Sequence, residues 1–149
     1  MTLTVPDICV ALALENSVFV KRHHYISFVD KYTTPPELGL SGELCYCLRG
    51  GVVHRAGMAS HPDFGATHVI FSVSKDSGAH ALAIQFDGKR AAMFSLHLFC
   101  QAMKGAAQKW YEEHESDPLV IKNMKNLIRF SPDGVRPFMA GLPVVASGE

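Results

Sequence analysis

The chain has 149 residues, of which 48% are hydrophobic and 19% charged, with 14 basic and 14 acidic side chains. This length is enough for one domain with a buried core, and the composition is that of a globular protein rather than a disordered one. The balanced charge provides no basic field for nucleic acid or an anionic membrane, and no apolar run approaches the length of a membrane span. Four cysteines in a chain of this size predict reduced thiols rather than a disulfide scaffold.

The N-terminal part of the chain carries helix signals. Thr4-Val5-Pro6-Asp7 is a capping-box pattern with proline in the first turn, so we expect a helix from about residue 5 into the low twenties. A short second helix around residues 26–31 fits the sequence, before Thr33-Thr34-Pro35-Pro36 interrupts all regular structure.

Ser41 is expected to begin the next helix. As an N-cap it predicts a helix through roughly residue 49, with Gly50-Gly51 as its stop or as a kink before residues 52–56. The free N–H groups and the positive dipole end of a helix N-terminus stabilise a thiolate or an oxyanion nearby. The start of this helix is therefore a candidate position for a nucleophile.

Strand signals occupy the middle of the chain. Residues 57–66 predict a loop and residues 67–73 a strand, which a turn at 75–78 connects to a hairpin at 79–95. Because each of these connections is short, we expect three adjacent antiparallel strands.

The hairpin has a defined register. Asp87-Gly88 is a strong signal for a two-residue type I′ turn, in which both central residues need positive φ. With that turn, Phe86 pairs with Lys89 and His80 lies opposite Ser95. Since side chains alternate along a strand, His80 stands at the end of an apolar sheet face.

Helices are expected again after the hairpin. Residues 98–113 show an apolar stripe at helical spacing that should face the sheet, and a further helix should run from Asp117-Pro118 to about residue 129. The tail is rich in Pro and Gly. We therefore predict an α+β fold in a single domain, 1–149, with N-terminal helices in 1–57, the sheet and C-terminal helices in 66–130, and an irregular tail in 131–149.

His80 is the candidate catalytic base. A histidine oriented by a neighbouring strand is what a cysteine or serine hydrolase requires of its base. Ser41 is the candidate nucleophile, with Cys45 as an alternative one helical turn further on and Cys9 as a lesser one. The structural interpretations stay open beside these: Ser41 as a plain N-cap, His80 as a structural histidine, and the thiols as small buried hydrophobes.

This order of elements resembles that of papain-like cysteine hydrolases. Gly39-Leu40-Ser41-Gly42-Glu43-Leu44 is similar to the G-x-C-x-x-L start of their nucleophile helix, and residues 80–95 are similar to their histidine strand and the strand after it. The short separation of the two motifs looks like that in compact glutamine deamidase domains of bacterial toxins, of the Pasteurella multocida toxin type. YopT-type effector proteases are a more distant likeness. The resemblance covers roughly residues 38–115 and implies a papain-like arrangement, with the antiparallel sheet flanked by helices.

Two positions depart from the family pattern. Ser41 stands where the nucleophilic cysteine is expected, and Ser95 stands where an aspartate orients the histidine. Either position 41 is a deliberate substitution, or the chain is a natural pseudoenzyme, or Cys45 or Cys47 is the nucleophile instead. The resemblance implies an effector- or toxin-type cysteine hydrolase acting on a host protein, with a glutamine deamidase as the first expectation, here in an inactive Cys-to-Ser form. The alternative is a non-catalytic pseudoenzyme or a protein-binding or immunity module on the same fold.

No metal site and no cofactor are predicted. His54, His61 and His68 fall at intervals of seven, but no C-x-x-C pair or H-E-x-x-H motif accompanies them. The expected partner is a protein, as substrate or as binding partner, with no nucleic acid and no membrane span. The resemblance implies secretion without a cleavable signal peptide into a host cell and then a cytoplasmic location; without it, a cytoplasmic location is expected.

Overall fold

The structure is a computed structural model that describes residues 2–15, 18–55, 57–58, 65–66, 68–74 and 78–146. In chain order the described elements are η1 (Thr2–Thr4), α1 (Val5–Leu12), α2 (Arg22–Tyr32), α3 (Pro35–Leu38), α4 (Gly42–Arg55), β1 (His68–Ser72), β2 (Leu82–Phe86), β3 (Lys89–Ser95), α5 (Leu96–His114), α6 (Pro118–Met124), β4 (Arg129–Ser131), β5 (Gly134–Val135), β6 (Met139–Ala140) and β7 (Val144–Ala146). The prediction of an α+β fold is confirmed. The finer prediction of a papain-like arrangement stays a prediction.

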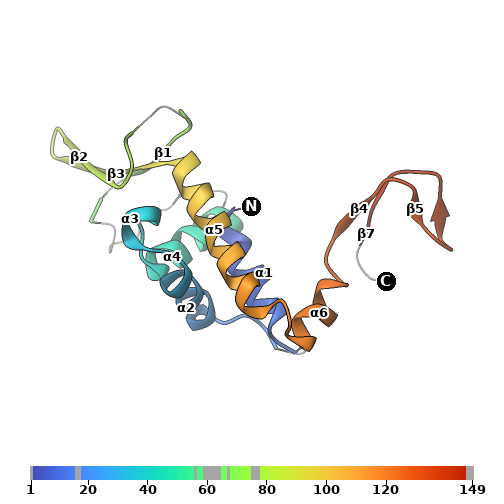
Figure 1. The fold of residues 1–149 in the computed structure, drawn as a ribbon. Helices are drawn as coiled ribbons and strands as arrows, with labels where there is room; N and C mark the ends of the chain where they lie inside the picture. Colours follow the sequence, from blue (N-terminus) through green and yellow to red (C-terminus); the bar gives the residue numbers. More distant parts are fainter. Residues whose placement is uncertain are drawn as a thin grey trace.

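Helix α5 is the axis of the molecule, running from the end of the sheet to α6 (Figure 1). Its predicted apolar stripe is confirmed by four buried side chains, Phe99, Met103, Ala106 and Trp110. The stripe faces mainly helices α1, α2 and α3 rather than the sheet. Phe99 alone of these four forms a ring contact with the sheet, where its centroid lies 5.4 Å from that of Phe71.

The core lies between α5 and the N-terminal helices. Fully buried side chains from α2 and α4 include Tyr25, Val29, Cys45 and Leu48. Burying each large apolar side chain contributes about 1.5–3 kcal/mol, so this cluster is the main source of stability. The Tyr25 hydroxyl donates to the Leu3 carbonyl at 2.9 Å, which satisfies the one polar atom of that ring.

The predicted long N-terminal helix is wrong, because α1 ends at Leu12 and α2 begins at Arg22. The reason is a tertiary contact. The side-chain amide of Asn123 donates to the carbonyls of Leu12 and Leu14 at 3.0 and 2.9 Å, and so satisfies groups that a continuing helix would have bonded itself. Helix α4, in contrast, is longer than the helix predicted to end near residue 49, because it continues through Gly50-Gly51 to Arg55.

The three-stranded sheet has the order β1-β3-β2. Strands β2 and β3 pair antiparallel with the predicted register, from Phe86↔Lys89 to Leu82↔Met93. Asp87 and Gly88 have φ of 48° and 70°, as a type I′ turn requires. The hairpin prediction is therefore confirmed for residues 82–93.

The prediction of three antiparallel strands is wrong for β1, which pairs parallel to β3. A tight turn would have placed β1 beside β2. Instead β3 lies between the two strands, since Ile70 and Leu82 pair with Met93 from opposite sides. Strand β2 returns the chain to the end of the sheet at which β1 begins, so β3 starts there and runs parallel to β1. Residues 75–77 of the predicted turn lie outside the described residues.

The tail predicted to be irregular, residues 131–149, contains short strands in its described part, 131–146. We call residues 125–146 the C-terminal arm. Strand β4 pairs antiparallel with β7, and β5 pairs with β6. Helix α6 ends at Met124 rather than near residue 129. Figure 1 shows the arm extending away from the helices, beyond α6. Of the helices in the described ranges, none combines the length and the apolar character needed to cross a membrane.

The turn between α3 and α4 depends on Gly39. Its φ is +75°, and a Cβ there would lie 3.0 Å from the Ala81 Cβ and 3.1 Å from the Phe94 ring. We therefore expect Gly39→Ala to lower the free energy of unfolding by about 2 kcal/mol or more, through strain and overpacking.

The matched control is Gly50→Ala. Gly50 lies inside α4, and a Cβ there meets nothing within 4 Å. Alanine should raise the free energy of unfolding by about 0.5–1 kcal/mol. Urea denaturation measures both variants, and a Gly39→Ala protein as stable as the unsubstituted chain would contradict the described packing of the turn.

Candidate functional site

His80 lies immediately before β2 rather than inside it. The strand expected to begin at His80 begins at Leu82, because Ala81 has a φ of 56°, in the left-handed region that breaks strand geometry. His80 still reaches Ser95, by its side chain instead of by strand pairing. The predicted neighbours are therefore in contact.

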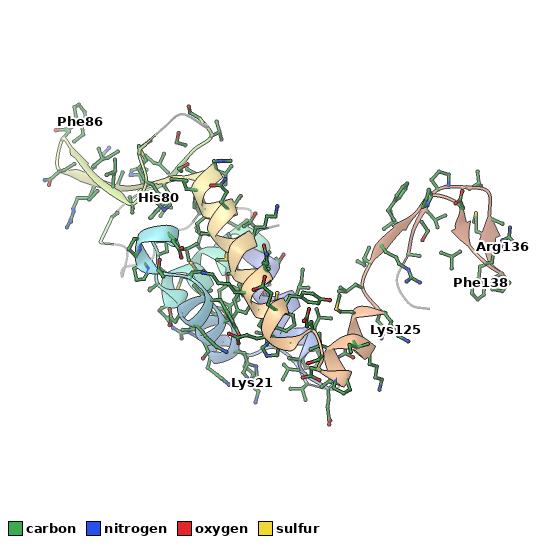
Figure 2. All side chains as sticks on the ribbon, in the orientation of Figure 1. Lys21, His80, Phe86, Lys125, Arg136 and Phe138 are labelled. Atoms are coloured by element: carbon green, nitrogen blue, oxygen red, sulfur yellow. The ribbon has the colours of Figure 1, made fainter. Side chains whose placement is uncertain are left out.

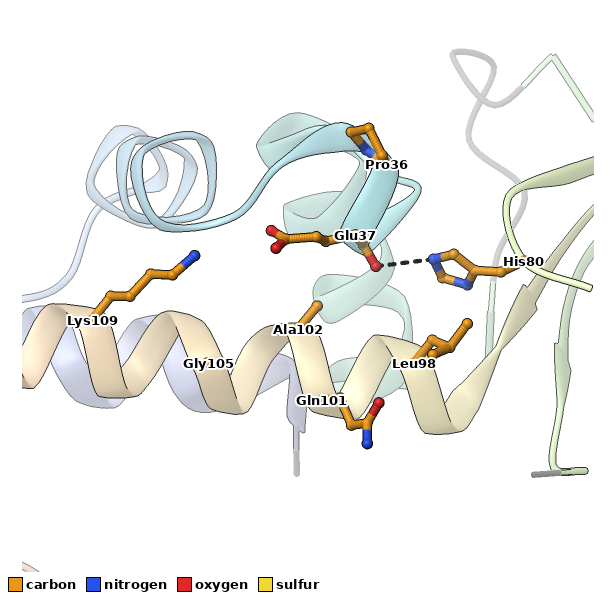
Figure 3. Close-up of a pocket in the computed structure, with 8 residues that line it drawn as sticks. All are labelled: Pro36, Glu37, His80, Leu98, Gln101, Ala102, Gly105 and Lys109. Atoms are coloured by element: carbon orange, nitrogen blue, oxygen red, sulfur yellow. Dashed lines mark hydrogen bonds between the residues drawn. The ribbon is translucent and has the colours of Figure 1, made fainter. Parts of the chain in front are cut away.

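Both ring nitrogens of His80 are hydrogen bonded to the backbone. The Ser95 N–H donates to Nδ1 at 3.2 Å, and Nε2 lies 3.1 Å from the carbonyl oxygen of Glu37. Because Nδ1 accepts, Nε2 carries the proton in this arrangement and donates to the carbonyl (Figure 3). A general base needs a free lone pair directed at its nucleophile, and this ring directs neither nitrogen at one.

The Ser95 hydroxyl serves the helix that follows it. Its Oγ accepts from the Leu98 N–H at 3.3 Å, as the N-cap of α5, and the residue is only 1% exposed. The contact with His80 comes from the Ser95 backbone. Ser95 therefore holds the ring by donating its N–H to Nδ1, whereas the aspartate of a papain-like hydrolase would accept a hydrogen bond from the ring.

Ser41 is the N-cap of α4, as its position predicts. Its Oγ accepts from the Leu44 N–H at 3.3 Å, and its side chain is exposed. The Gly42 N–H donates to Asp30 Oδ1 at 2.8 Å. A carboxylate therefore already occupies one of the amide groups that an oxyanion would need.

Gly42 allows this contact because a Cβ there would lie 2.7 Å from the Ile26 carbonyl oxygen. Helices α2 and α4 thus approach closely at the start of α4. The ion pair between Arg22 and Glu43 joins the same two helices. The site that the resemblance assigns to a nucleophile is here a packing junction.

Cys45 is fully buried on α4, and burial raises the pKa of its thiol to about 12, with the nearby Asp30 carboxylate acting in the same direction. Burial likewise raises the pKa of Cys9 to about 11. A nucleophilic cysteine needs a lowered pKa and access to substrate. Cys47 and Cys100 are partly exposed, and all four thiols are free.

The tertiary structure brings together some of the predicted residues and not others. His80 contacts Ser95, and Ala81 packs against Gly39 at the start of the α4 region. Among the hydrogen bonds of the described residues, none joins His80 to Ser41 or to Cys45. The topology therefore gathers the elements of the expected site without the atomic contacts of a catalytic pair.

A cavity of about 380 Å³ lies beside His80, between α3 and α5 (Figure 3). Its polar lining comes from Glu37, His80, Gln101 and Lys109, and its apolar lining includes Leu98 and Ala102. Hydrogen bonds from Thr34 and the charge of Lys109 lower the pKa of the Glu37 carboxyl. The volume is within the range of small-ligand pockets.

Sequence reasoning missed Gln101 and Lys109. Their signal was present, because residues 101, 105 and 109 repeat at four-residue spacing on α5, in a row beside its apolar stripe. What the sequence did not show is that α3 covers this row. Only the packed structure places Glu37 and His80 over it.

No group of three or more metal-binding side chains gathers in the part of the chain that the structure describes. The His54 ring lies beside the Arg49 guanidinium, with the two nitrogens 3.4 Å apart. A neighbouring cation disfavours a metal ion at that histidine. His61 lies outside the described residues.

Comparisons with known proteins add no assignment. No protein-family model matches this chain. No curated protein and no solved structure matches it either.

The His80 contacts predict a structural role for this ring. His80→Ala removes both hydrogen bonds and leaves the Ser95 N–H and the Glu37 carbonyl without these partners, so the free energy of unfolding should fall by about 1–3 kcal/mol. His97→Ala, at an exposed position in the first turn of α5, should change it by less than about 0.5 kcal/mol. Equal effects of the two substitutions in urea denaturation would show that the His80 bonds do not hold the fold.

Burial predicts the order in which the thiols react. At neutral pH the thiolate fraction falls about tenfold for each unit by which the pKa is raised, so Cys45 and Cys9 should resist alkylation in the folded protein. The partly exposed Cys47 and Cys100 should react first, and the other two only after unfolding. Intact-mass measurement followed by peptide mapping tests this, and rapid labelling of folded Cys45 would restore it as a candidate nucleophile.

Proposed function

We propose that this chain is a non-catalytic protein-binding module, of the pseudoenzyme, adaptor or immunity type. The observation that carries the proposal is the His80 ring, whose two nitrogens both bond to the backbone. The Ser41 and Ser95 hydroxyls cap helices, and the Cys45 thiol is buried. Each group that a hydrolase would use has a structural task instead.

The sheet offers a surface for a partner. Ile70, Met93 and Leu82 pair across the three strands and so share one face, and Ile84 and Phe86 continue that face along β2. We call these five residues the outer face. Phe86 is 82% exposed at its tip (Figure 2), and Ile70, Leu82 and Ile84 are each exposed by 40–47%. A contiguous exposed apolar surface favours a protein partner.

Strand β2 suggests how that partner binds. It is an edge strand of the described sheet, and residues 82–86 contain no charge and no proline. Edges of this kind accept an added strand, which gains backbone hydrogen bonds and places alternate side chains on the existing face. The proposed partner therefore contributes an extended segment with apolar residues at alternate positions.

A second candidate function is the effector- or toxin-type cysteine hydrolase that the resemblance implies. It is favoured by the approach of His80 to the α3–α4 turn and by the adjoining cavity, whose Gln101 and Lys109 could position a side-chain amide. In a glutamine deamidase, a cysteine thiolate at position 41 would attack the carboxamide carbon. Ammonia would leave with a proton from His80, and water would hydrolyse the thioester to a glutamate side chain. Delivery into a host cell without a cleavable signal peptide belongs to this candidate alone.

The test of catalysis compares the chain with its Ser41→Cys and Ser41→Cys/His80→Ala variants, each treated with a glutamine-mimicking electrophile. For a binding module we expect labelling of the thiol introduced at position 41 to be no faster than that of an exposed model thiol and unchanged by the loss of His80. Rapid labelling that depends on His80 would favour the hydrolase and identify this chain as its silenced form. Intact mass reads both results.

The test of binding selects a displayed library of random peptides on the immobilised chain. Sequences with alternate apolar residues should be enriched, and an Ile84→Asp/Phe86→Asp variant should lose them by at least tenfold in affinity. Phe138→Asp, a matched change on the C-terminal arm, should retain them. Enrichment that survives the β2 substitutions would contradict the proposed edge.

A further inference from the structure

The C-terminal arm exposes more apolar surface than a free arm should. Six large apolar side chains within it are 44–87% exposed, namely Ile128, Phe130, Phe138, Met139, Leu142 and Val145. Its two-stranded ribbons make their main contacts only with each other among the described elements. A two-stranded ribbon is marginally stable in water, so this arm requires a surface to pack against.

The net charge of the arm indicates the charge of the surface that it would contact. Within residues 125–146, Lys125, Arg129 and Arg136 stand against a single acid, Asp133. Figure 2 shows Arg136 and Phe138 together at the far end of the arm and Lys125 near α6. The arm therefore fits a surface that is both apolar and acidic.

Such a surface lies at the base of the arm. The acidic end of α5, residues 112–117, carries Glu112, Glu113, Glu115 and Asp117. Two exposed apolar side chains flank this stretch in the chain, Tyr111 on α5 and Ile121 on α6. Charge and apolar character thus match those of the arm.

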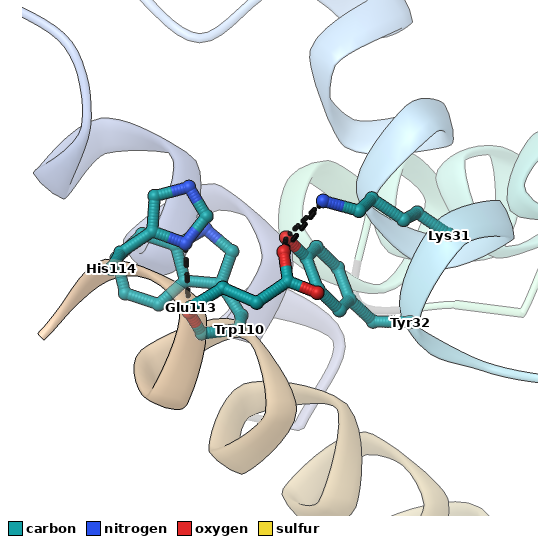
Figure 4. A network of polar contacts seen from close by, with 5 residues as sticks. All are labelled: Lys31, Tyr32, Trp110, Glu113 and His114. Atoms are coloured by element: carbon teal, nitrogen blue, oxygen red, sulfur yellow. Dashed lines mark hydrogen bonds and ion pairs between the residues drawn. The ribbon is translucent and has the colours of Figure 1, made fainter.

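Two of these carboxylates are already engaged, and the other two, Glu112 and Glu115, keep the surface acidic. Asp117 caps α6, where it accepts from the Leu119 N–H at 2.8 Å. Glu113 pairs with Lys31 at 2.6 Å and accepts from the Tyr32 hydroxyl at 2.7 Å, while Trp110 and His114 stack beside them (Figure 4). Glu112 accepts only from the neutral Gln108 side chain in the described contacts. Glu112 and Glu115 are exposed. They are available to cations from outside the chain.

We propose that two copies of this chain form a dimer in which the arm of each packs on the acidic end of α5 of the other. Because both surfaces belong to one chain, a two-fold axis satisfies both contacts at once. The six apolar side chains offer on the order of 700 Å², at roughly 100–150 Å² each. This approaches the roughly 800 Å² per partner that a stable interface buries.

A lipid or nucleic-acid partner fits less well. The arm's cations would attract phosphate groups, but the four acids at its base would repel them. In a dimer, the acids of one copy would instead attract the basic arm of the other copy. The proposal is independent of the binding module, since the arm and the outer face lie at opposite ends of α5 (Figure 1).

Analytical ultracentrifugation of the full chain tests the dimer. We expect a concentration-dependent dimer whose dissociation constant rises at least tenfold in Phe130→Asp/Phe138→Asp. Ile84→Asp/Phe86→Asp, the matched change on β2, should dimerise as the unsubstituted chain does. A chain that stays monomeric at all concentrations, or a dimer that survives the arm substitutions, overturns the proposal.

Charge exchange keeps the test valid if the apolar variants fail to fold. Arg129→Glu/Arg136→Glu and Glu112→Lys/Glu115→Lys should each be monomeric alone. Mixed together they should form a heterodimer, because one pair of surfaces has opposite charges restored and the other is unchanged. If each variant alone still forms a dimer, or if the mixture forms no heterodimer, the proposed contact between the arm and the acidic residues is wrong. Arm-dependent binding of a monomeric chain to vesicles containing phosphatidylserine would assign the arm to a lipid surface instead.

Discussion

The two hydrogen bonds of the His80 ring connect the end of the sheet with the N-terminal helices. Nδ1 accepts from the Ser95 N–H, where β3 becomes α5, and Nε2 lies within bonding distance of the Glu37 carbonyl on α3. The same Ser95 caps α5 with its hydroxyl. One ring therefore joins the end of the sheet to the N-terminal helices, and the position of α5 relative to α3 depends on it. The His80 ring is also part of the lining of the cavity between these two helices.

The hydrogen bonds of the His80 ring also affect whether it can act as a catalytic base. A histidine can act as a base only if one nitrogen is free to take a proton from a nucleophile, and the backbone engages both nitrogens here. At the start of α4, Asp30 and the Ser41 hydroxyl engage two of the amide groups that could otherwise hold an oxyanion. Structural hydrogen bonds thus take up the groups that a hydrolase would leave open for substrate. This competition for the same atoms is the physical reason why we propose binding rather than catalysis.

Helix α5 separates two surfaces of different character. Its 19 residues span about 28 Å, with the sheet at its N-terminal end and the acidic residues before α6 at its C-terminal end. The outer face is apolar with an open strand edge, which suits an extended partner segment. The arm and the acidic end of α5 are complementary to each other, which suits a second copy. A dimer joined at the second surface would present two outer faces, so a partner with two binding segments would gain affinity from their linkage.

Several elements of this protein were predicted correctly from local sequence patterns. The Asp87-Gly88 turn, the β2–β3 register, the caps at Ser41 and Asp117 and the apolar stripe of α5 all depend on neighbours within a few residues, so the amino-acid sequence by itself determined them. Contacts between distant residues decided the rest. Asn123 bonds to the end of α1 from 111 residues away, β1 pairs parallel to β3, and the ring of His80 bonds to the backbone of Glu37 instead of to a nucleophile. Only the tertiary structure could decide these, because a polar group in a folded chain takes whichever partner packing brings within reach, and that partner leaves no trace in the local pattern.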